Sequence, residues 1–162
     1  MSINVSAVQL KKSDFLDKVA RTIDVFGINP ANIQVELTET CLVDFMDGND
    51  KVIQKIADMG IAIALDDFGT GYSNLRYISE MNPDYVKIDK DFTAMAMRSE
   101  KDHELFRKII EMVHSVNIKI CIEGIEKEEW ACAMKEIHVD YMQGYLYGRP
   151  CEKGVFLNNY GI

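Results

Sequence analysis

The sequence has 162 residues, of which 18 are basic and 26 acidic, so its formal net charge at pH 7 is −8. Such an acidic chain is a poor partner for a DNA or RNA polymer, because nucleic-acid phosphates attract basic surfaces. With 48% hydrophobic residues, the chain can bury one sizeable core but not two, and we expect residues 1–162 to form a single domain.

The sequence shows no sign of membrane insertion or of an oxidising environment. No apolar run reaches the roughly 20 residues that span a bilayer, and no signal-peptide pattern precedes Asn4. Four cysteines have neither a CxxC pair nor another metal-binding spacing, namely Cys41, Cys121, Cys132 and Cys151. We therefore expect reduced thiols and a cytoplasmic location.

In chain order, short runs with the apolar character of β-strands alternate with helical patterns. The strand-like runs start near residues 3, 33, 61, 85, 118 and 139. The helical patterns lie at residues 15–26, 52–56 and 105–113, and we expect Met95 and Met97 to lie in a short linker. One helix and two loops separate successive strands, which favours parallel strands joined by right-handed crossovers. This pattern predicts an α/β fold of the (β/α) barrel type.

Polar residues follow the strand-like runs. They are Asn4, Glu36, Asp66, Asp67, Lys87, Glu123 and Gln143. Because the carboxyl ends of all strands in a (β/α) barrel open on one face, we expect these side chains to converge there.

Asp66 and Asp67 are the most informative of these residues. Two adjacent carboxylates at the end of the apolar run 61–65 suggest that a positive group, most simply a divalent metal ion, holds them in place. Gly69 and Gly71 would let the following backbone turn sharply and approach a ligand. The alternative is an Asp-rich turn that caps a helix beginning near Ser73.

Six segments closely resemble, in order, the signatures of the EAL family. They are Asn4–Ala7 with Gln9–Leu10, Glu36–Thr40, Asp66–Ser73, Lys87–Asp89, Glu123–Glu126, and Gln143–Leu146 with Arg149–Pro150. Members of that family are bacterial phosphodiesterases that linearise the second messenger cyclic di-GMP. The resemblance therefore implies a (β/α)8 barrel of the TIM type, a hydrolase activity and cyclic di-GMP as the bound partner.

The sequence departs from the family at its amino end. The Glu-Ala-Leu segment that gives the family its name, and whose Glu is a metal ligand there, does not occur before Asn4. Only about six strand candidates are present, where the family has eight. We therefore expect an N-terminally truncated, incomplete barrel whose activity is impaired.

The resemblance also implies a metal site of two ions. Asn4, Glu36 and Asp66 would hold the first ion, and Asp66 would bridge to a second ion held by Asp67 and Glu123. These side chains offer only amide and carboxylate oxygen, which hard cations such as Mg²⁺ or Mn²⁺ prefer. Two such ions can neutralise a phosphodiester and make a water nucleophilic near pH 7.

Lys87 lies on the strand-like run that starts near residue 85, so its ammonium should point into the barrel mouth. In the family, this lysine contacts the nucleophilic water. Carboxylates around an ammonium raise its pKa, so we favour orientation and charge stabilisation over a role as base. The alternative is a lysine that only balances the charge of Asp66 or Asp67.

Five further residues have roles by resemblance. Glu39 would anchor the glycine-bearing loop after Asp67, while Glu126 and Gln143 would donate or accept hydrogen bonds around the water. Glu126 could equally be an acidic residue favoured at a helix N-terminus. Tyr147 and Pro150 are candidates for contact with a guanine.

Two other functions remain open at this point. A barrel that lacks one metal ligand could be an inactive cyclic di-GMP receptor, and Lys87 could instead form a Schiff base in a lyase or aldolase. Open sheet edges near Ile3 and Tyr141 favour a homodimer. By resemblance, we also expect fusion to, or regulation by, sensory domains.

Overall fold

In the computed structural model, which describes residues 1–38, 40–42, 50–69 and 75–161, six parallel strands form one sheet in the order β1-β2-β3-β4-β5-β6. The strands are β1 (Ser2–Asn4), β2 (Gln34–Thr38), β3 (Ala62–Phe68), β4 (Tyr85–Ile88), β5 (Lys119–Ile122) and β6 (Tyr141–Met142). Sequence order equals sheet order, as in a barrel wall. The predicted α/β fold with six parallel strands is confirmed.

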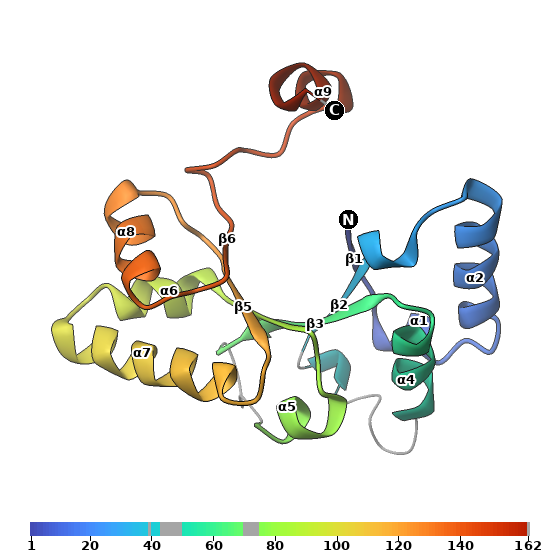
Figure 1. Ribbon diagram of the computed structural model, residues 1–162, viewed down its shortest axis with the longest axis horizontal. Helices are drawn as coiled ribbons and strands as arrows, with labels where there is room; N and C mark the ends of the chain where they lie inside the picture. The colour runs from blue at the N-terminus through green and yellow to red at the C-terminus, as the bar shows by residue number, and fades with distance from the viewer. Residues whose placement is uncertain (39, 43–49, 70–74, 162) are drawn as a thin grey trace.

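Helices follow the strands, most of them on the outer face of the curved sheet (Figure 1). They are α1 (Ala7–Leu10), α2 (Phe15–Phe26), the 3-10 turn η1 (Pro30–Asn32), α4 (Asp50–Asp58), α5 (Leu75–Met81), α6 (Lys90–Ala96), α7 (Glu100–His114), α8 (Glu128–Glu136) and α9 (Lys153–Tyr160). Among the helices that the structure describes, none combines the length and apolar character that a bilayer span requires. The helices predicted at 15–26, 52–56 and 105–113 lie within or close to α2, α4 and α7.

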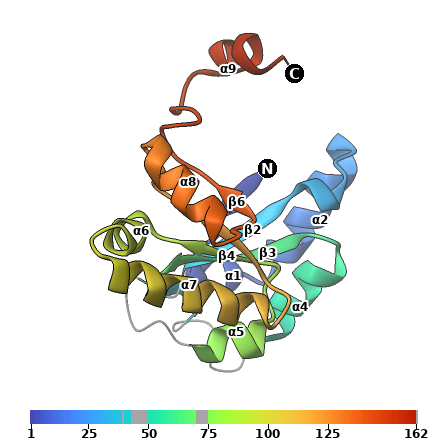
Figure 2. The same cartoon turned by 60° about the vertical axis from the view of Figure 1, so that its left-hand side comes forward.

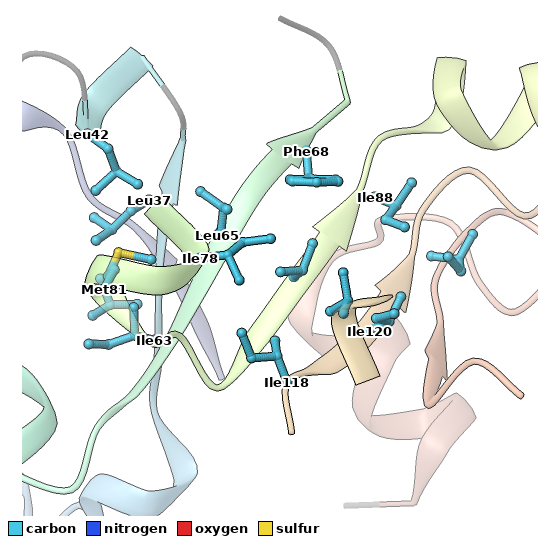
Figure 3. Close-up of a cluster of buried hydrophobic side chains, with 14 of the residues drawn as sticks. Leu37, Leu42, Ile63, Leu65, Phe68, Ile78, Met81, Ile88, Ile118 and Ile120 are labelled. Carbon is cyan, nitrogen blue, oxygen red and sulfur yellow. The ribbon is translucent and has the colours of Figure 1, made fainter. Parts of the chain in front are cut away.

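The core lies between the sheet and its outer helices. The middle strands are buried over most of their length, as expected for parallel strands covered by helices. Figure 3 shows Ile78 and Met81 of α5 beside Ile63 and Leu65 of β3, all of which belong to the buried apolar cluster. This packing fixes the sheet from outside and leaves the carboxyl ends of its strands available for polar groups.

Strand β3 contains an irregularity at the two aspartates. Leu65 pairs with Val86, but the next registered pair is Phe68 with Ile88, so β3 has one residue more than β4 over this stretch. Such a β-bulge bends the strand and redirects side chains. The strand that the sequence predicts to end before Asp66 therefore continues to Phe68, and the carboxylates of Asp66 and Asp67 lie inside the bulged segment.

The expected linker at Met95 and Met97 is wrong, because α6 occupies Lys90–Ala96. The Asp89 side chain caps this helix by accepting a hydrogen bond of 2.7 Å from the Asp91 N–H. Thr93, which is fully buried, donates its hydroxyl to the Asp89 carbonyl at 3.0 Å. A short helix with one cap and little periodicity gives a weak sequence signal.

Two aspartates at the amino ends of strands brace neighbouring strands. Asp84, just before β4, accepts the Ile63 N–H through Oδ2 at 2.8 Å. Asp140, just before β6, accepts the Ile120 N–H through Oδ2 at the same distance. His114 Nε2 of α7 lies 2.8 Å from the same Asp140 oxygen. These bonds fix the sheet at the end opposite to the carboxyl ends of the strands.

We expect Asp140→Ala to lower the free energy of unfolding by about 1–3 kcal/mol, because the buried Ile120 N–H loses its acceptor. Burial alone would raise the pKa of Asp140, but the bonds from Ile120 and His114 outweigh it and lower that pKa. An aspartate whose pKa is lowered in the folded state stabilises the fold at pH values above its unfolded pKa, which is near 3.8. This stabilisation is lost as the pH falls through the pKa of the folded state.

Urea unfolding at pH 7 and at pH 3 measures this effect. The difference between the parent and Asp140→Ala should be largest at pH 7 and smaller at pH 3. Asp58→Ala, which removes an exposed carboxylate on α4, serves as control and should change stability by less than about 0.5 kcal/mol. An equal effect of the two substitutions at pH 7 would contradict the bracing role.

Helix α9 stands apart from the rest of the molecule. In Figures 1 and 2 it lies at the end of an extended segment that leaves β6, away from the sheet and its outer helices. All its residues are exposed, including Val155, Phe156 and Leu157. The Tyr160 hydroxyl donates a hydrogen bond of 3.3 Å to the Tyr147 carbonyl, which ties the helix to its own connecting segment.

Candidate active site

Lys87 of β4 lies at the centre of a cluster of carboxylates. Its Nζ is 2.7 Å from Glu123 Oε1, 3.0 Å from Asp66 Oδ1 and 3.1 Å from Glu36 Oε2. The Lys87 side chain is only 7% exposed. The fold therefore brings together the predicted catalytic lysine and three of the five predicted metal ligands, although these residues span positions 36 to 123 of the sequence.

The fold explains why these side chains meet. Glu36 and Lys87 lie on β2 and β4, on either side of β3, while Glu123 directly follows β5. Side chains from alternate strands of a (β/α) barrel point inward at the same level. The bulge in β3 then adds Asp66 to that level. The predicted convergence at the carboxyl ends of the strands is thus found for these residues.

The surrounding carboxylates keep Lys87 charged. Burial lowers the pKa of its ammonium, but the hydrogen bonds and charges of Glu123 and Asp66 outweigh burial and hold that pKa above its ordinary value. Burial raises the pKa of the Glu123 carboxyl, which Lys87 only partly offsets. A Schiff base requires a neutral amine, so this environment disfavours a lyase that uses Lys87.

Asp67 is held in an unusual backbone conformation. Its φ is 58°, in the left-handed region that non-glycine residues adopt at a cost of about 1–3 kcal/mol. Its N–H donates to Asp66 Oδ1 at 3.1 Å, so the two aspartates are linked. Burial, then the charges of Asp66 and Asp89, raise the pKa of the Asp67 carboxyl. A bound cation would relieve this crowding of negative charge.

The donors in this site suit a hard divalent cation. Glu36, Asp66, Asp67 and Glu123 supply carboxylate oxygen, and Asn4 of β1 pairs in register with Glu36. As the side chains lie, no three His, Cys, Asp or Glu among the described residues form a ready metal cage. The Lys87 ammonium lies among three of these carboxylates instead. The chemistry of the donor set fits the ion, and the cluster already accommodates a cation.

The other predicted site residues lie on or near the segments that follow β5 and β6. Gln143 donates its N–H to the Ile122 carbonyl at 2.8 Å and accepts the Ile125 N–H at 3.1 Å, so its backbone borders the segment that carries Glu123. The side chains of Glu126 and Gln143 are exposed, as are Tyr147 and Pro150. The loop-anchoring residue Glu39 and the segment 70–74 lie outside the described residues.

Sequence reasoning missed two residues that support this cluster. Gln34 Nε2 lies 3.3 Å from Glu36 Oε1, on the same strand face because the residues are two apart in β2. Gly144 lies so close to the Ile125 backbone that a Cβ would collide with its carbonyl and amide. The period of two along β2 could have indicated Gln34. The close approach at Gly144 depends on tertiary structure.

The site and fold together define a (β/α) barrel-type domain with a cation-centred acidic cluster at the carboxyl ends of its strands. The family model described as the EAL domain matches residues 1–150. This chain belongs to the EAL domain family.

A curated relative supports this assignment. The cyclic di-GMP phosphodiesterase NbdA of Pseudomonas aeruginosa is 29% identical over 150 residues, which cover 93% of this chain and 19% of that protein. The chain therefore spans about a fifth of the length of such relatives.

Solved structures agree with the family assignment and extend it to ligands. The EAL enzyme Bd1971, in its cAMP- and cyclic-di-GMP-bound form, has a TM-score of 0.90 and 33% identity, covering 98% of this chain and 42% of that one. The Klebsiella pneumoniae protein BlrP1, in a manganese and cyclic di-GMP complex, has a TM-score of 0.84 and 26% identity, covering 93% of this chain and 38% of that one. Structures of proteins with this fold thus contain cyclic di-GMP, in one case together with manganese.

Proposed function

We propose that this chain provides the catalytic domain of a metal-dependent phosphodiesterase that hydrolyses cyclic di-GMP to the linear dinucleotide in bacterial signalling, with residues 1–162 as one EAL-type domain. The observation that carries the proposal is the Lys87 ammonium between Glu36, Asp66 and Glu123 at the carboxyl ends of the strands. Membership of the EAL family and the cyclic di-GMP complex of a structural relative support the same substrate.

In this mechanism, Asn4, Glu36, Asp66, Asp67 and Glu123 would hold two divalent ions, Mg²⁺ or Mn²⁺. When bound, such ions would supply positive charge to the phosphodiester and make a water more acidic. Lys87, which remains charged, orients the attacking water and stabilises negative charge that develops on the phosphoryl oxygens. Glu126 and Gln143 lie on neighbouring segments, and we assign both to hydrogen bonds around the water. Tyr147 and Pro150 are the residues we assign to contact with a guanine.

Incubation with cyclic di-GMP and either Mn²⁺ or Mg²⁺, followed by chromatography, tests the proposal. We expect the linear dinucleotide to appear with metal and to be absent with a chelator. Binding of cyclic di-GMP without cleavage would instead identify a receptor. Borohydride trapping of a carbonyl compound on Lys87 would identify a lyase.

We further propose that the chain forms a homodimer. Strands β1 and β6 are the two ends of the sheet, so each has one side without a paired strand among the described residues. Ile3 on β1 and Tyr141 on β6 are 39% and 47% exposed. Exposed strand edges with apolar side chains favour association, and a two-fold contact closes as a dimer.

Sedimentation velocity at micromolar concentration should show the mass of two chains. Ile3→Lys, which places charge on the β1 edge, should shift the population towards the monomer, whereas Val25→Lys on an exposed position of α2 should not. A monodisperse parent monomer that melts cooperatively would contradict the proposed dimer.

The remaining parts of the proposal concern the cellular setting. We propose a cytoplasmic enzyme, which agrees with four cysteines that form no disulfide among the described residues. We also propose that sensory domains regulate it, as the greater length of its relatives suggests.

A further inference from the structure

The amino-terminal turn of α6 packs against the backbone that follows Asp67. A Cβ placed on Gly69 would lie 2.6 Å from Phe92 Cδ1 and 2.8 Å from Phe92 Cγ. Gly69 also has a φ of 98°, which only glycine adopts readily. The Phe92 ring therefore lies directly on the chain two residues beyond Asp67, with no room for a larger residue between them.

The same turn packs against the backbone that follows Glu123. A Cβ on Gly124 would collide with Lys90 Cβ and lie 3.0 Å from Lys90 Cα, and Gly124 has a φ of 71°. In addition, the Asp89 N–H donates to the Phe68 carbonyl at 3.3 Å. One short helical turn, residues 89–92, thus contacts the exits of both β3 and β5.

Phe92 is itself anchored in the core. Its ring makes an edge contact with Phe106 of α7, with 5.5 Å between the centroids and 63° between the planes. Phe106 is fully buried. A rigid path of packed groups therefore runs from the core through Phe92 to Gly69, and the strained backbone of Asp67 lies next to it.

We propose that Phe92 and Lys90 are positioning residues that hold Asp67 and Glu123 in place for a divalent cation. The inference rests on the proposed function, because it assigns these two carboxylates to the metal. Phe92 acts on Asp67 through Gly69, and the Lys90 backbone acts on Glu123 through Gly124. Asp67 has a left-handed φ and belongs to the bulged part of β3, so its orientation depends on packing from outside the strand.

Titration of Mn²⁺ into the full chain, followed by electron paramagnetic resonance of the free ion, measures metal affinity without any need for turnover. We expect Phe92→Ala to weaken Mn²⁺ binding by about tenfold or more, in the range found for groups that orient metal ligands. Phe92→Leu, which restores most of the volume, should recover most of that affinity. Where hydrolysis is measurable, Phe92→Ala should raise the Mn²⁺ concentration needed for half-maximal rate more than it lowers the rate at saturating metal.

Phe15→Ala is the matched control. Phe15 is a partly buried phenylalanine at the start of α2 that packs against the core. Its removal should lower the melting temperature to a similar extent but leave Mn²⁺ affinity within twofold of the parent. Equal loss of affinity in Phe15→Ala and Phe92→Ala would overturn the inference, since general loosening would then explain both.

A double-mutant cycle tests the contact between Gly69 and the Phe92 ring. Gly69→Ala should weaken Mn²⁺ binding more in the parent than in the Phe92→Ala background, because the added methyl group meets the ring only in the parent. Strictly additive effects would overturn the inference. If the parent binds Mn²⁺ but does not cleave cyclic di-GMP, the proposed function fails while these affinity ratios still decide the positioning role.

Discussion

Lys87→Ala is expected to lower the rate of cyclic di-GMP cleavage by a factor on the order of 10²–10⁴ while changing affinity for the dinucleotide only a few-fold. The reason is that the ammonium acts mainly on the attacking water and on charge that develops in the transition state. Single-turnover rates and binding titrations of the same preparation measure the two quantities separately.

Removal of the buried Lys87 ammonium also leaves Glu36, Asp66 and Glu123 without their shared partner, which lowers the stability of the fold. Melting curves must therefore accompany the kinetics, and Lys87→Met provides a second variant that keeps the length of the side chain. Lys119→Ala, an exposed lysine at the start of β5, is the control and should leave both quantities unchanged. Equal losses of rate and affinity in Lys87→Ala would indicate a substrate-binding role instead.

The second large effect is expected for Asp66→Asn, which should abolish Mn²⁺- or Mg²⁺-dependent cleavage, with a loss of at least about a hundredfold at saturating metal. Asp66 is the carboxylate we assign to bridge the two ions, and the substitution removes its charge while keeping its shape. Glu36 and Glu123 still pair with Lys87, so the fold should be retained.

Asp17→Asn on the exposed face of α2 is the matched control, because it makes the same chemical change on a helix that carries no residue of the candidate site. Its rate should equal that of the parent within error. Cleavage by Asp66→Asn within tenfold of the parent at saturating metal would refute the bridging assignment.

The sequence was sufficient to predict the parallel β/α architecture and the acidic cluster. Short apolar runs with polar residues at their ends are local features, and the βα alternation then dictates that those ends meet. Lys87, Glu36, Asp66 and Glu123 are in contact for that reason. The metal, the catalytic roles and the loop role of Glu39 remain predictions, since nothing in the described structure tests them.

The features that sequence reasoning missed depend on contacts between distant segments. The bulge at Asp66 and Asp67 is defined by pairing with β4, which periodicity along β3 does not reveal. The sequence around Met95 and Met97 does not reveal helix α6, because the helix is only seven residues long and draws its stability from Asp89 and from packing on Phe106. Gly69 indicates a turn in the sequence, but nothing local shows that α6 lies against both Gly69 and Gly124.

The bracing aspartates at the amino ends of β4 and β6 have the same spacing to residues of the candidate site. Three residues beyond Asp84 comes Lys87, and three residues beyond Asp140 comes Gln143; their partners Ile63 and Ile120 are likewise each followed, three residues later, by the carboxylates Asp66 and Glu123. The same spacing therefore occurs in two strand pairs, β3 with β4 and β5 with β6. In each pair, the aspartate at the amino end of one strand fixes the backbone of its neighbour three residues before a polar residue of the candidate site. The two braces thus set the height of Asp66 relative to Lys87, and of Glu123 relative to Gln143.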